Sequence, residues 1–386
     1  MKARFSTRTN WDTRESALAE EVRHARASGR RIHDLTLSNP TACGFAYDEA
    51  AVLGALAQPA AMLYDPDPRG MRVAREAVAA YYADHDAQID PDDVILTTST
   101  SEAYSYLFRL LCDAGDEVLV AQPSYPLFDF LADLDDVRLK PYPLFYDFGW
   151  WIDFAALEAA IGPRTRAVLL VHPNNPTGHA TRALERTRLE ELCAWHGLAL
   201  IVDEVFVDYG LDGPIDSFAQ GPHAALTFVV SGLSKICGLP QMKAAWLAAF
   251  GPEAVRRGAL GRLEIVADTF LSMNAPVQLA MPAWLRERQG IQEHILERVR
   301  ANLELLTSAG FEVLTPEAGW CAVVRLPDLE SSASLLVRLI AEFGVVVHSG
   351  SFYGMRERSR VVISLLGPLE EFRAGIMELR RAFEPN

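Results

Sequence analysis

The sequence alternates apolar stretches with amphipathic ones between residues 94 and 231, and this rhythm strongly constrains the fold. Short apolar stretches that predict β-strands are VILTT (94–98), EVLVAQP (117–123), RAVLLVHP (166–173), LALIVDEVF (198–206) and LTFVVS (226–231). Longer stretches typical of helices lie between them, at 101–115, 125–134 and 183–197. Apolar strands that alternate with helices predict an α/β fold, in which a parallel sheet is covered on both faces.

The rhythm changes beyond about residue 270. A long helical stretch at 278–310 is followed by expected strands at 319–326, 344–350 and 360–365 and expected helices at 332–344 and 370–383. A chain of 386 residues exceeds one ordinary core, so we expect two domains. We assign residues 45–270 to a large domain, and residues 1–44 together with 271–386 to a smaller α+β domain.

Composition limits the partners and the location. Acidic residues outnumber basic residues by 51 to 36, for a net charge of −15, which argues against nucleic acid or an anionic membrane as the main partner. The five cysteines show no CxxC spacing, so neither a disulfide framework nor a metal site is expected. There is no apolar signal core and no apolar run near the roughly 20 residues of a membrane helix. We expect a soluble, cytoplasmic protein.

Polar segments follow four of the expected strands. TSTSEA follows VILT, HPNNPTG follows AVLLV, DEVF follows LALIV, and SGLSK follows LTFVV. Ligands of open parallel sheets bind beyond the carboxyl ends of the strands. We therefore expect these four segments to meet at one edge of the sheet and to form a binding site there.

Two charged residues stand out in these segments. Asp203 ends an almost wholly apolar strand, where an unpaired carboxylate is costly and needs a cation. Lys235 lies among small and hydroxyl residues after another strand. Each also has an ordinary interpretation: Asp203 as a helix cap or ion-pair partner, and Lys235 as a solvated loop lysine paired with it.

The other two segments favour a ligand. Hydroxyls and backbone N–H groups at Ser99, Thr100 and Ser101 begin an expected helix, which is a natural anion site unless they serve only as a cap. NNPTG places an amide at a strand end, although it is also compatible with an ordinary turn. Together the four segments suit a ligand with an anion, a cationic ring atom and an electrophilic carbon. Pyridoxal phosphate has all three, with its aldehyde on Lys235 as a Schiff base.

The chain resembles the class I/II aminotransferases of the fold-type-I pyridoxal phosphate enzymes. Seven marks stand in the family's order: YDPDPRG with Tyr64 and Gly70, TSTSEA, PSYP (123–126), HPNNPTG, DEVF, SGLSKICGLPQMK and SRVVIS. The resemblance covers most of the chain. It implies a large domain with a mostly parallel, seven-stranded type of sheet between helices, and it places pyridoxal phosphate in that domain. It also implies an aminotransferase that acts on an α-amino acid and a 2-oxo acid.

Roles for individual residues follow from the resemblance. Lys235 would hold the cofactor and then move the substrate's α-proton, while Asp203 would keep the ring nitrogen protonated. Asn175 would bond the ring's 3-oxygen and the substrate, and Tyr125 would stack on the ring unless it packs in the core. The residues implied at the phosphate are Ser99, Thr100, Ser101, Ser234 and Lys243.

The resemblance also implies a substrate end and a second subunit. Arg360 would hold the substrate α-carboxylate with its guanidinium, unless it is a surface arginine of the strand, and Asn39 would lie nearby. Tyr64 would reach the phosphate of the neighbouring subunit, which implies a homodimer with shared active sites. Phe5 and Trp11 are candidates for the residues that select the side chain of the amino donor.

Three positions depart from the family's common pattern. Phe206 stands where a tyrosine usually bonds the ring's 3-oxygen, so one hydrogen bond should be lost. Lys243 replaces an arginine at the phosphate and supplies a point charge without a planar fork. Gly232 stands where many relatives have serine. These departures leave the cofactor unchanged but leave open which reaction the chain catalyses.

Other functions remain possible from the sequence. The same scaffold carries β-lyases and biosynthetic enzymes of specialised metabolism, which use the same cofactor. A ligand-sensing regulator would place a DNA-binding domain before the scaffold, and we expect no room for one ahead of LTLSNP. A nucleotide-binding dehydrogenase is disfavoured because no GxGxxG or P-loop string occurs.

Overall fold

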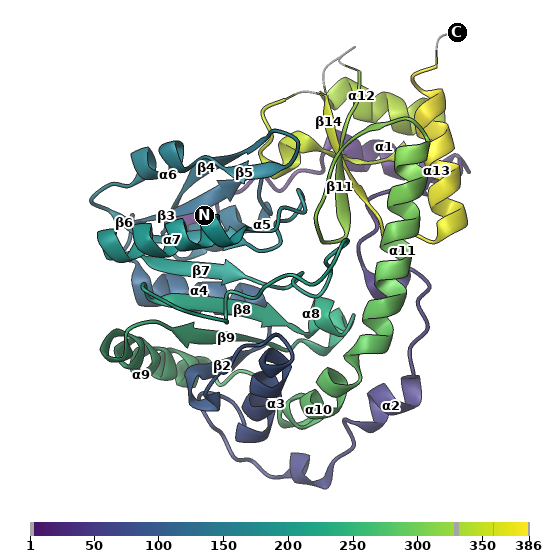
Figure 1. Ribbon diagram of the computed structural model, residues 1–386. Helices are drawn as coiled ribbons and strands as arrows, with labels where there is room; N and C mark the ends of the chain where they lie inside the picture. Colours follow the sequence, from purple (N-terminus) through teal and green to yellow (C-terminus); the bar gives the residue numbers. More distant parts are fainter. Residues whose placement is uncertain (1–3, 328–331, 358, 385–386) are drawn as a thin grey trace.

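A computed structural model describes residues 4–327, 332–357 and 359–384 (Figure 1). Its large sheet has the strand order β2-β9-β8-β7-β6-β3-β4-β5. The pairs β8–β7, β7–β6, β6–β3 and β3–β4 are parallel, whereas β9 and β5 run antiparallel to their neighbours. The strands are β2 (Val94–Thr97), β3 (Glu117–Gln122), β4 (Arg138–Tyr146), β5 (Trp150–Ile152), β6 (Thr165–Val171), β7 (Ala199–Asp203), β8 (Thr227–Gly232) and β9 (Ala245–Phe250).

The central strands are apolar throughout because both faces of this sheet are covered. Successive residues of β6 alternate between two cores: Val168 packs in one and Leu169 in the other. The first core is covered by α3 (Arg72–Ala83), α6 (Phe154–Ala160), α7 (Ala183–His196) and α10 (Ala275–Arg286). The second is covered by α4 (Thr100–Leu111), α5 (Leu127–Leu134) and α9 (Glu253–Phe270). The expected α/β fold, with a mostly parallel sheet between helices, is confirmed; β5 is an additional short edge strand.

A second, antiparallel sheet lies in the C-terminal part, in the order β10-β11-β14-β13. Its strands are β10 (Glu312–Leu314), β11 (Cys321–Arg325), β13 (His348–Ser349) and β14 (Arg360–Ser364). The helices of this part are α11 (Arg288–Ser308), α12 (Ser332–Arg338) and α13 (Leu369–Arg381), with a π-helical turn, η6 (Leu339–Phe343), after α12. Figure 1 shows α11 running from the large sheet to the small one.

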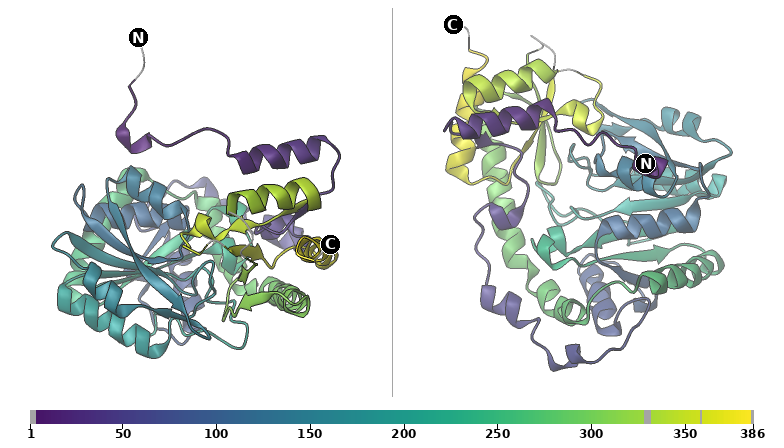
Figure 2. Two further views of the ribbon diagram at one scale, coloured as in Figure 1. Left: turned by 90° about the horizontal axis from the view of Figure 1, so that it is seen from above. Right: turned by 180° about the vertical axis from the view of Figure 1, so that it is seen from behind.

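The N-terminal segment lies on both parts of the molecule. β1 (His33–Asp34) pairs with β12 (Val345–Val346), and α1 (Ala17–Ala27) contacts α12. Further towards the N-terminus, η1 (Thr7–Thr9) contacts α5 (Figure 2). There Trp11 donates to Asp133 at 2.8 Å and meets Phe130 edge-on at 5.2 Å. The domain boundaries at residues 44/45 and 270/271 stay a prediction.

Short helical turns complete the chain. They are η2 (Pro40–Ala42), α2 (Glu49–Gly54), η3 (Pro59–Met62), η4 (Pro91–Asp93), α8 (Leu233–Ile236), η5 (Pro240–Met242) and η7 (Gly350–Tyr353). Three of them, α8, η5 and η7, carry or flank residues of the cavity described below. Within the described ranges, no helix combines the length and apolar character that crossing a membrane requires.

Candidate active site

A cavity of about 610 Å³ lies where the polar segments after the large-sheet strands meet the small sheet. We name its two sides by the sheets that carry them. The large-sheet wall includes Ser99, Thr100, Ser101, Tyr125, Asn175, Asp203, Phe206, Ser234 and Lys235. The small-sheet wall consists of Trp320, Cys321, His348, Phe352 and Tyr353. The four sequence segments expected to share one edge of the sheet therefore do meet, and Lys243 also lines the cavity.

Asp203 is a buried acid without a full counter-charge. It ends β7, and its side chain accepts hydrogen bonds from the Tyr104 hydroxyl at 2.6 Å and the Val205 backbone N–H at 3.0 Å. Burial raises the pKa of the Asp203 carboxyl, and the two donors and the charge of Lys235 oppose that shift. A cation placed against this carboxylate would be strongly favoured.

Lys235 brings an amine into the same cavity. It lies on α8 directly after β8, and its backbone oxygen accepts from the Tyr209 hydroxyl at 2.6 Å, which fixes that turn. Its Nζ lies 5.5 Å from the ring centre of Trp320 and 5.9 Å from that of Phe206. Burial lowers the pKa of the Lys235 amine, partly offset by Asp203. The amine is therefore more nucleophilic at neutral pH than a solvated one.

Asn175 presents an unused acceptor to the cavity. The neighbouring Asn174 holds the turn by accepting from the Thr177 backbone N–H at 3.3 Å and its hydroxyl at 2.8 Å. The Oδ1 atom of Asn175 is buried, yet it has no hydrogen-bond partner among the described residues. A buried unpaired acceptor is costly, so this site is built to receive a donor from a ligand.

The N-terminus of α4 forms the anion end of the cavity. The Ser99 hydroxyl accepts from the Glu102 backbone N–H at 3.1 Å, and Glu102 accepts from the backbone N–H and hydroxyl of Thr98. Ser99, Thr100 and Ser101 at this helix start line the cavity, and the unsatisfied N–H groups of a helix N-terminus favour an anion. Lys243 adds a positive charge beside them and is itself exposed.

Packing explains the glycine at position 232. A Cβ there would lie 2.8 Å from the Cβ of Ala245 and 2.9 Å from the backbone oxygen of Ala244. Strand β8 therefore approaches its neighbour β9 too closely for a serine without a shift of backbone. Sequence reasoning had treated Gly232 only as a lost hydroxyl.

The structure does not bring three of the residues named from the sequence into the cavity. The Arg360 guanidinium pairs with Glu357 at 3.1 Å and lies 5.6 Å from the ring centre of Trp150. Asn39 caps η2 by accepting from the backbone N–H of Thr41, and its neighbour Ser38 lines the cavity instead. Tyr64 is 80% exposed at the molecular surface.

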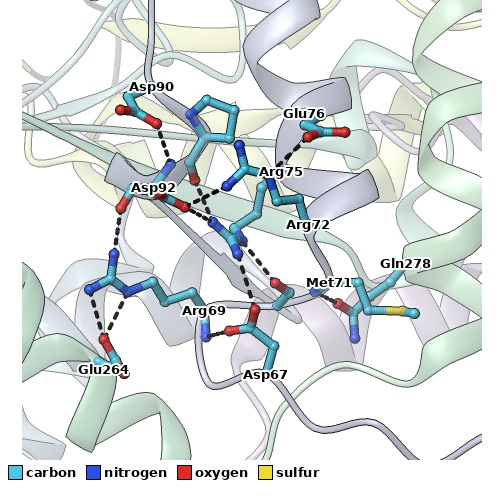
Figure 3. A network of polar contacts seen from close by, with 12 residues as sticks. Asp67, Arg69, Met71, Arg72, Arg75, Glu76, Asp90, Asp92, Glu264 and Gln278 are labelled. Carbon is cyan, nitrogen blue, oxygen red and sulfur yellow. Dashed lines mark hydrogen bonds and ion pairs between the residues drawn. The ribbon is translucent and has the colours of Figure 1, made fainter.

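A polar network holds residues 67–75, which follow Tyr64 in the chain (Figure 3). At its centre the buried Arg75 guanidinium donates to the backbone oxygens of Gly70 and Pro91, both at 2.8 Å, and pairs with Asp67 at 3.0 Å and Asp92 at 2.8 Å. Two of these four contacts hold Asp67 and Gly70, and the other two hold Arg75 to the turn at Pro91 and Asp92.

Sequence reasoning missed the small-sheet wall and Tyr104. The Trp320 ring meets Phe206 edge-on at 5.4 Å, and the His348 ring stacks on Phe352 at 5.2 Å. Neither contact has a contiguous motif, because Trp320 directly precedes β11, His348 lies on β13 and Phe352 lies on the turn η7. Tyr104 lies inside the TSTSEAY segment, but only the fold shows that its hydroxyl reaches Asp203.

The profile of the family "Aminotransferase class I and II" matches residues 46–372. The chain belongs to this family. A similar relative is the alanine aminotransferase of Mycobacterium tuberculosis (strain ATCC 25618 / H37Rv), 29% identical over 341 residues, which cover 84% of this chain and 79% of that one. Another is the glutamate-pyruvate aminotransferase AlaA of Escherichia coli (strain K12), 29% identical over 72% of this chain and 69% of that one.

Solved aminotransferases share the fold. An alanine aminotransferase from Pyrococcus furiosus has a TM-score of 0.89 at 20% identity and covers 98% of this chain and 99% of that chain. A Thermus thermophilus aspartate aminotransferase mutant has a TM-score of 0.87 at 22% identity and covers 99% and 100%. The predicted family, fold type, pyridoxal phosphate dependence and aminotransferase activity are thereby confirmed.

The residues of the cavity fit the family's cofactor. The buried acid at Asp203 suits a protonated ring nitrogen, and the open acceptor of Asn175 suits a hydroxyl of the ring. The N-terminus of α4 suits a phosphate, and the Lys235 amine suits an aldehyde. Nothing in the described lining conflicts with that assignment.

Proposed function

We propose that this aminotransferase moves an amino group from an α-amino acid to a 2-oxo acid in the 610 Å³ cavity, with Lys235 as the covalent and proton-transferring residue. The observation that carries the proposal is that one cavity is lined by both Lys235 and Asp203. Lys235 supplies a half-buried amine with a lowered pKa, and Asp203 supplies a buried carboxyl. The proposal keeps the roles that the resemblance implied for the large-sheet wall.

Several residues would hold the cofactor. Asp203 would face the ring nitrogen, Asn175 the ring's 3-oxygen, and Tyr125 one face of the ring. The phosphate would be held by Ser99, Thr100, Ser101, Ser234 and Lys243. When bound, pyridoxal phosphate supplies an electrophilic aldehyde and a protonated ring that withdraws electrons from the substrate's α-carbon.

Lys235 performs the proton transfer in this proposal. The Nζ of Lys235 would accept the proton that leaves the substrate α-carbon. It would then donate this proton to the carbon on the other side of the transferred nitrogen. Burial lowers the pKa of this amine, so a larger fraction is neutral and able to accept a proton near pH 7. Asp203 is held by Tyr104 and Val205, so it needs no reorganisation to keep its position during this step.

We also propose a homodimer in which Tyr64 completes the partner's phosphate site. Met62, Leu63 and Tyr64 are each more than two-thirds exposed, an unusual run of apolar surface for a monomer. The Arg75 network anchors Asp67 and Gly70, which follow this run in the chain. Sedimentation velocity tests the dimer, and a monomer at micromolar concentration would refute it. A cytoplasmic location stays a prediction, as do the substrate roles of Arg360 and Asn39.

One experiment tests the reaction and its residue together. Purified enzyme is incubated with pyridoxal phosphate, reduced with borohydride and digested, and we expect the cofactor's mass on the peptide that contains Lys235. Lys235→Ala should carry no such mass, and its kcat should fall by about 10⁴-fold because it loses the group that moves the proton. Lys243→Ala is the matched control, which should keep the mass on Lys235. An untagged wild-type peptide would refute the assignment.

An amino-donor screen with pyruvate and 2-oxoglutarate as acceptors identifies the substrate pair. Relatives named alanine aminotransferase and glutamate-pyruvate aminotransferase make alanine and glutamate the first donors to test. Amino-group transfer that requires the acceptor supports the proposal. Release of ammonia and a 2-oxo acid without any acceptor would instead identify a β-lyase on the same scaffold.

A further inference from the structure

His179 lies buried between two carboxylates from different parts of the molecule. Its Nε2 lies 3.2 Å from a carboxylate oxygen of Glu185 in α7, and its Nδ1 lies 3.4 Å from one of Glu317, which precedes β11. The His179 side chain is 2% exposed, and neither ring nitrogen has an aligned hydrogen-bond partner among the described residues. The imidazole therefore joins the large domain to the segment that leads into the small sheet, and it does so by charge.

These two contacts require a proton on each ring nitrogen. A neutral imidazole has one N–H and one lone pair, so its lone pair would face a carboxylate oxygen in a buried place, which is costly. Burial acts to lower the pKa of the His179 imidazole, but the contacts with Glu185 and Glu317 outweigh it, and the net shift is upward. His179 is therefore the imidazolium at neutral pH.

The other charged groups around the imidazole balance it. The Arg182 guanidinium pairs with Glu317 at 2.9 Å and lies 3.6 Å from Glu185, so two cations face two carboxylates. The neighbouring His172 stays neutral, because burial lowers its pKa to about 4 and its Nδ1 accepts a backbone N–H at 3.1 Å. Loss of the proton from His179 would leave Arg182 alone between the two carboxylates.

Glu317 belongs to a segment that is attached directly to the large domain. Its carboxylate also accepts from the Ala180 backbone N–H at 3.0 Å. The backbone N–H groups of Glu317 and Ala318 both donate to the Gly178 oxygen at 3.1 Å. A Cβ at Gly178 would lie 2.6 Å from the Ala318 oxygen, so the two backbones are in close contact. Trp320 of the small-sheet wall follows two residues after Ala318.

Both of the joined segments continue to the cavity. One follows Asn175 in the chain, and the other leads into Trp320, whose ring centre lies 5.5 Å from the Nζ of Lys235. Asn175, Trp320 and Lys235 all line the cavity, whereas His179 lies outside its described lining. The contacts around His179 therefore set how the small-sheet wall lies relative to the loop of Asn175.

We propose that His179, as an imidazolium, is a positioning residue for amino-group transfer, which holds Trp320 and the small-sheet wall against the loop of Asn175. This inference rests on the proposed function, because it assumes that the substrate lies between the cofactor ring and this wall. Lys235 and Asp203 lie outside these contacts, so cofactor binding should depend little on His179.

The inference predicts a pH dependence with a definite sign. The raised pKa of His179 means that its contribution is complete below the ordinary imidazole value of 6.5 and is lost as pH rises through the raised pKa. Burial acts to raise the pKa values of Glu185 and Glu317, but their contacts with His179 outweigh it, so both stay ionised over this range. The kcat/KM of the wild type should therefore fall on the alkaline side.

The test compares His179→Gln, Glu317→Gln and His223→Gln in the enzyme loaded with pyridoxal phosphate. Glutamine at position 179 keeps an N–H donor without a titratable charge. His223→Gln is the matched control: His223 is also a buried imidazole beside a carboxylate, Glu190 at 3.4 Å, but it precedes β8, at the end of the large sheet opposite the cavity.

Three quantities are measured. They are kcat/KM per cofactor-loaded site as a function of pH, the cofactor dissociation constant, and hydrogen exchange of the peptide that contains residues 317–320. The cofactor absorbance of each variant reports whether it is folded. The same absorbance, followed with pH, separates titration of the chromophore from titration of His179.

We expect His179→Gln to lower kcat/KM by about tenfold to a hundredfold at neutral pH, because a displacement of about 1 Å in an active site can cost that much. Its alkaline fall should disappear, and exchange in residues 317–320 should be faster by about tenfold. Glu317→Gln should move the alkaline fall to lower pH, since it removes a carboxylate that raises the pKa of His179. His223→Gln should stay within about threefold of the wild type in every quantity, since it moves no cavity residue.

Several results would overturn the inference while amino-group transfer stands. They are a wild-type kcat/KM or unchanged exchange in His179→Gln, and an equal loss in His223→Gln. An alkaline fall that persists in His179→Gln, at a pH where the cofactor absorbance is constant, would also overturn it. If the wild type transfers no amino group to any 2-oxo acid, the proposed function is wrong. The exchange comparison then decides by itself whether His179 holds the wall.

Discussion

The two walls of the cavity differ in origin and in chemistry. The large-sheet wall carries an acid, an amide, hydroxyls and the reactive amine, and nearly all of these follow parallel strands directly. The small-sheet wall is mainly aromatic, and its residues come from an antiparallel sheet and a 3-10 turn. This difference shows that the fold itself brings the cofactor-binding residues together, because the carboxyl ends of the strands meet at one edge of the large sheet. The substrate end is built separately and is free to vary between family members.

The largest expected effect lies in the large-sheet wall. Asp203→Asn removes the buried negative charge that would face the ring nitrogen, and breaking a buried charge pair costs about 3–5 kcal/mol. We therefore expect kcat to fall by about 10²–10³-fold, with weaker cofactor binding measured by absorbance titration. Asp208→Asn is the matched control, since Asp208 is also a shielded carboxylate but pairs with His85 and Tyr81 instead. Equal losses of cofactor affinity in both variants would show that burial alone, and no ring partner, explains Asp203.

This contrast between the walls also decides what the sequence could predict. The polar segments that contain Asp203 and Ser99 are contiguous and lie at strand ends, so pattern alone placed them together. His348 and Trp320 are 28 residues apart and neither stands in a recognisable motif. Their approach depends on the pairing of β11, β13 and β14 and on how that sheet packs against the large one. No local rule encodes such packing.

The secondary structure also divides into elements that the sequence predicts and elements that it does not. The buried parallel strands were predicted from their apolar runs, but β4 was not, because Pro141 and Pro143 interrupt its sequence. The structure accommodates both prolines because β5 pairs only with residues 144–146, so residues 138–143 lie at the open edge of the sheet. Helix α9 was also missed, since Gly258 and Gly261 weaken its helical pattern.

The second prediction concerns Tyr104, which supports Asp203 from behind. Its hydroxyl donates a buried 2.6 Å hydrogen bond to the carboxylate, and hydrogen bonds to charged groups contribute about 1.5–3 kcal/mol. Tyr104→Phe should raise the pKa of Asp203 and lower kcat by about tenfold or more. The cofactor dissociation constant, measured by absorbance, should rise with it.

Tyr106 provides the control on the same helix. Its hydroxyl lies 3.2 Å from that of Ser272, away from Asp203, so Tyr106→Phe removes a comparable group without touching the acid. We expect cofactor affinity and kcat of Tyr106→Phe to stay within about threefold of the wild type. A Tyr104→Phe variant that matches it in both quantities would exclude a positioning role for Tyr104.

The smallest expected effect lies at Phe206, where the two walls touch. Phe206 belongs to the large-sheet wall and meets Trp320 edge-on at 5.4 Å, with the Lys235 Nζ 5.9 Å from its ring centre. Phe206→Tyr restores the hydroxyl that the family usually directs at the ring's 3-oxygen. One added hydrogen bond contributes about 0.5–1.5 kcal/mol, so cofactor affinity should rise by about threefold to tenfold. The pH at which the visible absorbance titrates should fall, since the hydroxyl favours the deprotonated chromophore.

Phe352→Tyr is the control for Phe206 on the opposite wall. It adds the same hydroxyl on the small-sheet wall, where Phe352 stacks on His348 and where the substrate rather than the ring is expected. That variant should leave the absorbance titration unchanged and affect only KM. If Phe352→Tyr moved the titration and Phe206→Tyr did not, the cofactor ring would lie against the small sheet. The assignment of the cofactor to the large-sheet wall would then be wrong, because a single hydroxyl acts only on the group within its hydrogen-bonding reach.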